Sequence, residues 1–554
     1  MNRRKFIQTT GLSIATVLIN ESIFAKEVQK IMNFPDEVSA IINGKKVTLF
    51  GKNKQIWSFQ DVTVKLKNTG KSIAVHIKAP KVKLSAVTLK WKVPSKKSST
   101  VLNDHWERTY GDVSWHKNSE TEILPWYFME NNGKKTNGFG VKTGTNSFCF
   151  WQIKNDKLSL TMDTRTGSEG VELGDRQLLA AEIVTMKGDI NDTPFQVSRK
   201  FMSVMCDKAR MPKQPVYGIN DWYFSYGENS EKIILDHTQM MAPLAEGLDN
   251  RPFSMVDAGW YKRAQSLPND VCWGDMRTPS SKFGDMGKLA NKISNMGMRP
   301  GIWTRPLCGS DDDAKSLILP VIKGREDRPV LDPSIPENLD RIKNHYKLYN
   351  QWGYEIVKFD FTTYDIFGKW GFDMVKDKTM TANNWTMYDR SKTNAEIVLN
   401  FYKTMRDAAG MTYLISCNTI SHLSAGLFEL NRTGDDTSGN EWERTRKMGV
   451  NTLAHRGIHH GTFYAADGDC VGLTTKISWE RNKKWMELLA KSGTPLFISA
   501  HADATGAEQK EFIKKCFKIA SKEMPVAEPL DWMTNAYPEK WKVANEILTF
   551  DWVK

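Results

Sequence analysis

Short apolar runs alternate with longer helical stretches from about residue 211 to residue 520. This alternation is typical of βα units that build a parallel sheet. Eight strand candidates follow one another: Tyr217–Tyr223, Phe253–Asp257, Arg299–Thr304, Glu355–Asp360, Thr412–Cys417, Phe428–Gly434, Gly461–Ala466 and Pro495–Ser499. Eight such units predict an α/β chain with a (β/α)8 TIM barrel.

The region before the barrel has a different pattern. Apolar and polar residues alternate there in short runs, such as 62–66 and 73–77, which predicts antiparallel strands. We expect a β-sandwich that supports the barrel or recognises substrate. The predicted division is a leader at 1–25, a β-sandwich domain at 26–210, a catalytic barrel at 211–535 and a short C-terminal tail at 536–554.

The first 25 residues read as an export signal. Arg3 and Arg4 precede Phe6 and a short apolar stretch, which resembles a bacterial twin-arginine signal cleaved near Ala25. An ordinary secretory signal or an uncleaved anchor is the alternative. No later segment reaches the ~18 apolar residues of a membrane span. We therefore expect an exported protein, periplasmic or extracellular, without stable membrane insertion after signal removal.

The composition excludes several classes of protein. Hydrophobic residues make up 40% and charged residues 25% of the 554, so the chain can bury a core and is not disordered. The net charge of +13 is scattered along the sequence, which argues against nucleic-acid binding. No Gly-rich phosphate loop follows the first strand, and the seven cysteines lack a C-x-x-C pair. We expect no cofactor, and the 19 tryptophans favour a carbohydrate partner.

Polar and aromatic residues cluster where the predicted barrel strands end, which is where active sites lie in this fold. Those we single out as candidate substrate-binding residues are Trp222, Asp257, Trp260, Trp303, Arg305, Lys358, Cys417 and Arg432.

Two carboxylates at this rim suggest acid and base chemistry. Asp360 ends a buried strand with Lys358 two positions earlier on the same face, and a cation there would keep a nucleophilic carboxylate ionised. Asp435 and Asp436 follow a later strand, and adjacent acids raise the pKa of one of them. Two such carboxylates are the machinery of glycoside hydrolysis. A structural salt bridge at Asp360 and a helix cap at Asp435 or Asp436 are the alternatives.

Two other polar clusters are weighed as metal sites. His455, His459 and His460 precede an Asp-Gly-Asp run, but their spacing fits no standard zinc motif. The three acids at 311–313 are more typical of a solvated loop than of a calcium site. We therefore predict no metal.

Longer motifs in the barrel region carry a family resemblance. They are FSMVDAGW (253–260), FGDMGKLA (283–290), GMRPGIW (297–303), WGYEIVKFD (352–360), RTGDD (432–436) and SGTPLFIS (492–499). Over about residues 212–535 and in the same order, the chain resembles the melibiases. These are retaining α-galactosidases of glycoside hydrolase family 36, including its raffinose-synthase-like members.

The resemblance implies roles for individual residues. Asp360 would be the nucleophile and Asp435 the acid/base, with Asp436 as the alternative. Lys358 and Arg432 would bind sugar hydroxyls, and Asp257 would bind the sugar O4 and O6. Trp260 or Trp222 would stack on the sugar ring.

The chain departs from this family at one informative position. Ala258 stands where the family has a second loop aspartate, so the resemblance predicts hydrolysis of an α-glycoside more firmly than galactose itself. Two other functions stay open: a transglycosylase that uses the same site, and a carbohydrate-binding barrel without catalysis.

Overall fold

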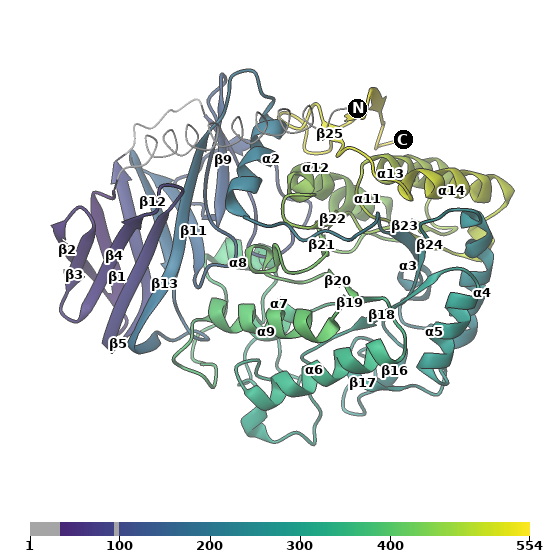
Figure 1. The fold of residues 1–554 in the computed structure, drawn as a ribbon, viewed down its shortest axis with the longest axis horizontal. Coiled ribbons are helices and arrows are strands. Elements are labelled where there is room, and N and C mark those ends of the chain that lie inside the picture. Colours follow the sequence, from purple (N-terminus) through teal and green to yellow (C-terminus); the bar gives the residue numbers. More distant parts are fainter. Residues whose placement is uncertain (1–33, 93–98) are drawn as a thin grey trace, which may run out of the picture.

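The computed structural model describes residues 34–92 and 99–554. The predicted export signal lies outside them. Figure 1 shows two parts side by side: strands of the N-terminal half on the left, and strands surrounded by helices on the right. Within the described residues, no helix has the length and hydropathy that a membrane crossing requires.

Antiparallel strands form the N-terminal part, as the period-two pattern predicts. In the described part of the chain they make a thirteen-stranded sheet with branched pairings. The strands are β1 (Glu37–Ile42), β2 (Lys45–Asn53), β3 (Ile56–Phe59), β4 (Val62–Asn68), β5 (Ile73–Lys92), β6 (Thr100–Asn103), β7 (His116–Lys117), β8 (Leu124–Pro125), β9 (Tyr127–Asn131), β10 (Thr136–Val141), β11 (Phe148–Lys154), β12 (Lys157–Asp163) and β13 (Val171–Lys187).

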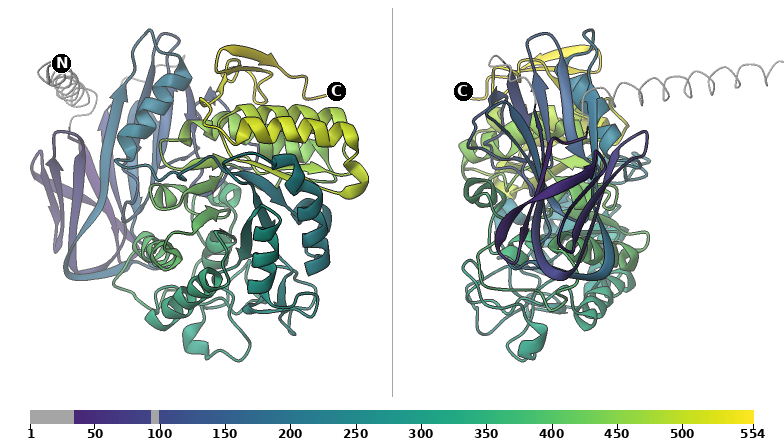
Figure 2. Two further views of the ribbon diagram at one scale, coloured as in Figure 1. Left: turned by 45° about the vertical axis from the view of Figure 1, so that its right-hand side comes forward. Right: turned by 90° about the vertical axis from the view of Figure 1, so that its left-hand side faces the viewer.

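Strand β5 connects two groups of these strands. Its first half pairs with β4 and β13, and its second half pairs with β1 and β12. Alternate side chains of all these strands enter one apolar cluster, which includes Val64, Val87 and Trp151. Helix α2 (Pro194–Met205) packs its apolar face on the same cluster through Phe201 and Met205. Figure 2 shows this layered part from the side.

Parallel strands form the second part. The sheet order is β22-β21-β20-β19-β18-β15-β14-β24-β23, and each neighbouring pair is parallel. The strands are β14 (Tyr217–Asn220), β15 (Phe253–Val256), β18 (Arg299–Thr304), β19 (Ile356–Phe359), β20 (Tyr413–Ser416), β21 (Leu430–Arg432), β22 (Ala465–Asp467), β23 (Cys470–Leu473) and β24 (Leu496–Ala500).

The predicted seventh strand differs from the observed one. The sequence predicts a strand at 461–466, but 461–463 form a turn, Tyr464 forms an isolated bridge with His460, and the strand begins at Ala465. It is interrupted after Asp467 and resumes as β23, because Asp469 has a left-handed backbone with φ of 71°. The two edge strands of the parallel sheet are therefore separated by two residues, Gly468 and Asp469.

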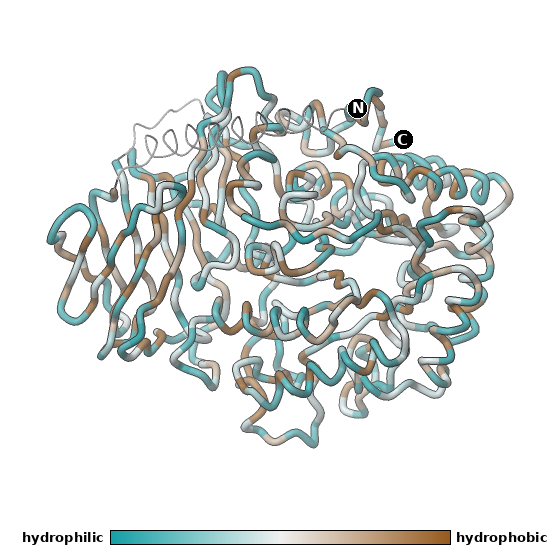
Figure 3. Tube along the Cα trace, viewed as in Figure 1, coloured by the Kyte–Doolittle hydropathy of each residue, from teal (hydrophilic) through white to brown (hydrophobic). Residues whose placement is uncertain are grey.

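Helices connect these strands and lie outside them (Figure 1). They are α3 (Trp222–Ser225), α4 (Glu231–Met241), α5 (Met286–Asn295), α6 (Pro336–Gln351), α7 (Thr362–Phe367), α8 (Gly371–Asp377), α9 (Asn394–Ala409), α10 (Ser421–Ser424), α11 (Trp442–Thr445), α12 (Thr452–Arg456), α13 (Trp479–Lys491) and α14 (Ala507–Ala520). Apolar residues run along the strands, and hydrophilic residues gather on the outer turns (Figure 3). Two further strands, β16 (Tyr261–Arg263) and β17 (Gly274–Pro279), pair antiparallel as a hairpin.

The predicted tail is partly ordered into a small sheet. Strands β25 (Glu528–Pro529), β26 (Lys540–Val543) and β27 (Glu546–Thr549) pair antiparallel. The expected boundary at residue 535 therefore falls inside this sheet.

Candidate active site

The first feature of the rim is a buried ion pair between the ends of β19 and β15, which lie on either side of β18. Lys358 Nζ on β19 donates to Asp257 Oδ2 after β15 at 2.7 Å, and Asn220 Nδ2 donates to the same oxygen at 2.6 Å. Burial lowers the pKa of Lys358, but Asp257, Cys417 and Asp436 together outweigh burial and hold the pKa well above its ordinary value. Lys358 is therefore a permanent cation, and its direct partner is Asp257 rather than the predicted Asp360.

Asp360 lies directly after β19 with its carboxylate at the rim. Its backbone N–H donates to Thr304 O at 3.1 Å, and Phe361 N–H donates to its Oδ1 at 2.7 Å. Phe361 has φ of 60°, a left-handed conformation that is costly for a bulky residue and is found at functional sites. Burial raises the pKa of Asp360, while the charges of Arg108 and Lys358 lower it.

The cation closest to Asp360 comes from the N-terminal part. Arg108 Nη1 lies 4.0 Å from Asp360 Oδ1, and its Nη2 lies 2.6 Å from Asp435 Oδ1. The loop of Arg108 is held at this place by β-type pairing, since Thr109 N–H donates to Thr433 O at 3.3 Å and Asp435 N–H donates to Thr109 O at 3.1 Å. One guanidinium thus joins the two carboxylates that the sequence singles out.

Sequence reasoning missed Arg108. The N-terminal part was expected to hold no reaction centre, and a lone arginine in an irregular segment has no periodic signal. The non-alternating, charged run at 104–112 was the available sign, because it interrupts the strand pattern.

Asp435 and Asp436 differ in their contacts after β21. Asp435 is held on its second oxygen as well, where Arg444 Nη2 lies 2.8 Å from Oδ2. Asp436 Oδ1 receives a longer contact of 3.2 Å from Arg432. Burial raises the pKa of Asp436, but Arg432, Arg108 and Lys358 outweigh burial and lower it to about 2. We expected repulsion to raise the pKa of one of the two adjacent acids; that acid is not Asp436, because cations surround it.

Arg432 is almost completely buried beneath Asp436. Its Nη2 lies 2.8 Å from Asp469 Oδ2, and Asp469 also accepts from Thr437 N–H at 2.8 Å and from the Tyr223 hydroxyl. These contacts tie the ends of β14, β21 and β23 together. They fix the guanidinium at the rim without a contribution from a ligand.

The predicted aromatic residues lie in two different settings. Trp260 is fully buried, and its indole N–H donates to Trp303 O at 2.9 Å. Trp303 is 2% exposed and stacks on Tyr261 at a ring distance of 5.9 Å. The structure thus places both indoles in the core, where they support the Asp257 loop. Trp222 is half-buried beside Tyr226 and keeps an exposed surface for a ligand.

Arg305 and Cys417 are also buried. Arg305 forms two hydrogen bonds with Asp365, and its guanidinium lies 4.0 Å from the centre of the Phe361 ring. It therefore supports the residue next to Asp360 and does not itself reach the rim. Burial, and the neighbouring charge of Asp360, raise the pKa of the Cys417 thiol well above its ordinary value.

The three histidines weighed as metal ligands have separate partners. His455 Nδ1 lies 2.9 Å from Asn451 O, His459 Nε2 lies 2.9 Å from the Tyr127 hydroxyl, and His460 Nδ1 accepts from Ala466 N–H at 3.2 Å. Across residues 34–92 and 99–554, no group of three or more potential ligands converges on one point.

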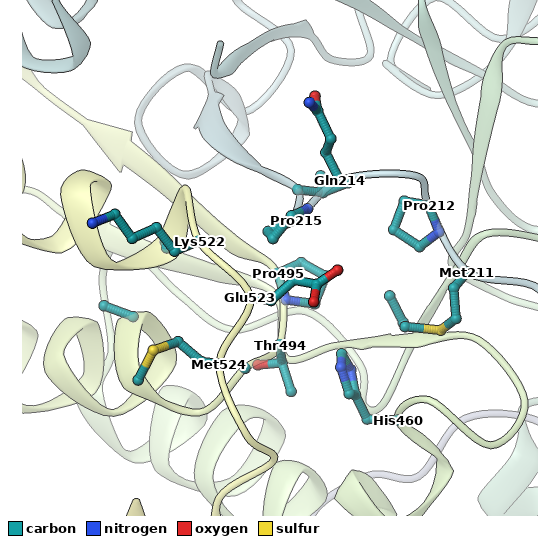
Figure 4. A pocket seen from close by; sticks show the side chains of 15 residues that line it. Met211, Pro212, Gln214, Pro215, His460, Thr494, Pro495, Lys522, Glu523 and Met524 are labelled. Carbon is teal, nitrogen blue, oxygen red and sulfur yellow. The ribbon is translucent and has the colours of Figure 1, made fainter. Parts of the chain in front are cut away.

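A cavity of about 270 Å³ opens at the opposite edge of the parallel sheet, where β14 and β24 begin (Figure 4). Its lining is largely apolar, with Met211, Pro215 and Met524 facing it together with Glu523 and His460. A second carboxylate is absent from this lining. The paired acids at the rim are therefore the better candidate for a reaction centre.

Comparisons with known proteins show that this fold is shared with glycosidases. No family model matches the sequence, and no curated protein does. Among solved structures, the α-galactosidase TtGalA from Thermus thermophilus, in complex with p-nitrophenyl α-D-galactopyranoside, matches with a TM-score of 0.58 at 15% identity. The match covers 93% of this chain and 99% of that chain.

Two further structures support the same comparison. The family 36 α-galactosidase AgaA from Geobacillus stearothermophilus matches with a TM-score of 0.60 at 12% identity, over 88% of this chain and 76% of that chain. A family 31 sulfoquinovosidase from E. rectale matches with a TM-score of 0.56 at 12% identity. This match covers 94% of this chain and 87% of that chain. The resemblance to family 36 that the motifs indicate is thus confirmed at the level of the fold.

Proposed function

We propose that this protein is an exported retaining exo-α-glycosidase, and that terminal α-linked galactose is its most suitable substrate. The observation that supports this proposal most directly is one guanidinium, Arg108, between the carboxylates of Asp360 and Asp435. The fold shared with α-galactosidases supports it independently. Export remains a prediction from the leader alone.

The proposal includes a finer description of the fold. We infer that the parallel strands close into a (β/α)8 barrel, since the two edge strands β22 and β23 are the halves of one interrupted strand. We also infer a β-sandwich before it, in which β5 passes from one layer to the other. In such a barrel the loops after the strands face one common site.

The proposed reaction is a double displacement. Asp360 attacks the anomeric carbon while Asp435 protonates the departing glycosidic oxygen, which gives a covalent glycosyl-enzyme. Asp435 then removes a proton from water as the water attacks that carbon, and Asp360 departs. Both displacements invert the anomeric carbon, so the released sugar keeps its original configuration.

The resemblance to family 36 assigns the acid/base role to Asp435, with Asp436 as the alternative. A pKa of about 2 keeps Asp436 ionised near neutral pH, so it is a poor proton donor there. An ionised Asp436 instead stabilises the positive charge that develops at the anomeric centre. Lys358, Asp257 and Trp222 are proposed to bind the sugar.

The test uses the protein without residues 1–25 and a panel of p-nitrophenyl α- and β-glycosides. We expect hydrolysis of the α-galactoside, its loss in Asp360→Ala, and partial rescue of that variant by azide with a β-galactosyl azide product. Asp340→Ala, an exposed acid on α6, is the matched control and keeps full activity. Sugar binding without hydrolysis of any glycoside would favour a binding barrel, and a high yield of transfer to added sugars would favour a transglycosylase.

A further inference from the structure

We infer that Arg108 is a positioning residue for the reaction, so that the N-terminal β part completes the catalytic centre of the parallel part. This inference rests on the proposed function, because the two carboxylates that Arg108 joins are the proposed nucleophile and acid/base. It assigns a role in the reaction to the N-terminal β part, which the sequence pattern alone predicts to be a supporting domain.

The geometry of the guanidinium carries the inference. Its Nη2 lies 2.6 Å from Asp435 Oδ1 and its Nη1 lies 4.0 Å from Asp360 Oδ1, while the side chain is only 5% exposed. A planar guanidinium spreads its charge over a rigid fork, so one group can contact Asp435 directly through Nη2 while Nη1 attracts Asp360 across 4.0 Å. A lysine ammonium is a compact point charge and does not bridge two carboxylates in the same way.

Other contacts prevent Arg108 from turning away. Its Nε lies 3.2 Å from Glu107 Oε1, and Glu107 in turn accepts hydrogen bonds from Gly371 N–H and the Tyr110 hydroxyl, both at 2.6 Å. The Asn418 side chain also donates to Glu107. A side chain at position 371 would meet Glu107 Oε2 at 2.8 Å, so the glycine allows this close approach.

Two partners of Glu107, Gly371 and Asn418, come from the barrel side of the molecule. Gly371 begins α8, in the segment that follows Asp360, and Asn418 follows β20. Trp370 lies beside the Arg108 guanidinium, with its ring centre 5.6 Å away. The loop at 104–110 is therefore docked onto the strand ends by side chains as well as by its backbone pairing.

The positive charge of Arg108 lowers the pKa of Asp360. The charged and titratable groups that face Asp360 are Arg108 from this loop, Lys358 on β19, Asp436 after β21, Cys417 after β20 and Cys272 in the hairpin β16–β17. Among the cations, Arg108 lowers the pKa of Asp360 most. Without it, the ionised nucleophile would face Asp436 with Lys358 already paired to Asp257.

The experiment compares Arg108→Met and Arg108→Lys with the unmodified protein, using kcat and KM for p-nitrophenyl α-galactoside as a function of pH. In Arg108→Met we expect kcat to fall by ~100-fold or more with a small change in KM, and the acidic limb of kcat/KM to move to higher pH by about one unit. Arg108→Lys keeps the charge without the fork, so it should restore the acidic limb but only part of kcat.

The control is Arg176→Met, which removes another contact between the two parts. Arg176 on β13 pairs with Glu396 on α9 at 2.7 Å and contacts neither Asp360 nor Asp435 in the hydrogen bonds and ion pairs of the described residues. We expect its kinetics to match those of the unmodified protein. An acidic limb that stays in place in Arg108→Met, with activity that falls only as much as thermal stability does, overturns the inference.

A second measurement does not depend on the substrate. If the unmodified protein hydrolyses no glycoside, the proposed function fails, and thermal unfolding of the same variants from pH 4 to 8 still tests Arg108. The loss of Tm in Arg108→Met should then grow as pH rises, because buried carboxylates ionise without their cation. A loss of Tm that is the same at every pH overturns the role of Arg108 in setting their charge.

Discussion

Lys358 and Asp257 form a buried ion pair across the rim, with Nζ 2.7 Å from Oδ2. The pair joins the ends of β19 and β15, two strands that are separated by β18 in the sheet. It leaves Asp360 to be neutralised from the other side, by Arg108. The proposed nucleophile, Asp360, and the proposed sugar-binding carboxylate, Asp257, thus have separate cations.

This separation predicts a large stability effect at Lys358. Lys358→Met leaves Asp257 buried without its partner, and we expect a loss of about 3 to 5 kcal/mol in the free energy of unfolding. Urea unfolding at pH 7 measures it. The double variant with Asp257→Asn should lose less than Lys358→Met alone, because no unpaired charge remains buried. Lys343→Met, which breaks an exposed pair with Asp340, should cost at most about 1 kcal/mol.

Substitutions of the two adjacent acids should differ in how strongly the loss of activity depends on the leaving group. Asp435→Asn removes the proton donor, so it should lose ~100-fold or more on an α-galactoside whose leaving group is a sugar, and much less on the p-nitrophenyl glycoside. Azide should restore turnover by attacking the glycosyl-enzyme, with retention of configuration. Asp436→Asn is the matched variant and should show neither effect. Rescue of Asp436→Asn in place of Asp435→Asn would assign the acid/base role to Asp436.

Substitution of Trp222 should affect sugar binding, whereas substitution of Trp260 should affect stability. Trp222 keeps an exposed surface, so Trp222→Ala should raise KM about tenfold with little change in Tm. Trp260 is fully buried, so Trp260→Ala should cost about 3 to 5 kcal/mol of stability. Steady-state kinetics and urea unfolding of both variants separate the two roles. An unchanged KM in Trp222→Ala contradicts its proposed contact with the sugar.

Much of the fold follows from sequence patterns, because a strand buried on both faces reads as a continuous apolar run between polar rim residues. Residues 356–359 and 496–500 are such strands; the first lies inside its predicted range, and the second extends one residue beyond its predicted end at Ser499. The break at Asp469 was not predicted. It depends on the left-handed backbone of this residue, and a pattern of apolar residues contains no information about backbone conformation at a single position.

The partners of the site residues were less predictable than the residues themselves. A period of two places Lys358 and Asp360 on one face of a strand, but it does not say which neighbouring strand supplies a counter-charge. Asp257 takes that role for Lys358, and Arg108 takes it for Asp360, from a loop that is remote in sequence. Contacts of this kind depend on how the two parts pack together.

Glu107 behind Arg108 predicts a dependence of stability on pH. Burial raises the pKa of Glu107 to about 7 from an ordinary value near 4.5, despite the opposing charge of Arg108. Between these values the folded protein binds more protons at Glu107 than the unfolded chain does. The stability contributed by this group is therefore complete below about pH 4.5 and is lost as pH rises towards 7.

Glu107→Gln removes this titration and keeps an oxygen that accepts from Gly371 and Tyr110. We expect the decrease in the free energy of unfolding between pH 5 and pH 8 to become smaller by up to about 3 kcal/mol, the equivalent of the pKa difference. Urea unfolding at several pH values measures this slope, and the exposed Glu546→Gln should leave it unchanged. Asp221 and Asp467, whose pKa values burial raises to about 6, still titrate in Glu107→Gln, so part of the slope should persist. A slope equal to that of the unmodified protein would show that Glu107 is already ionised in the folded protein at pH 5.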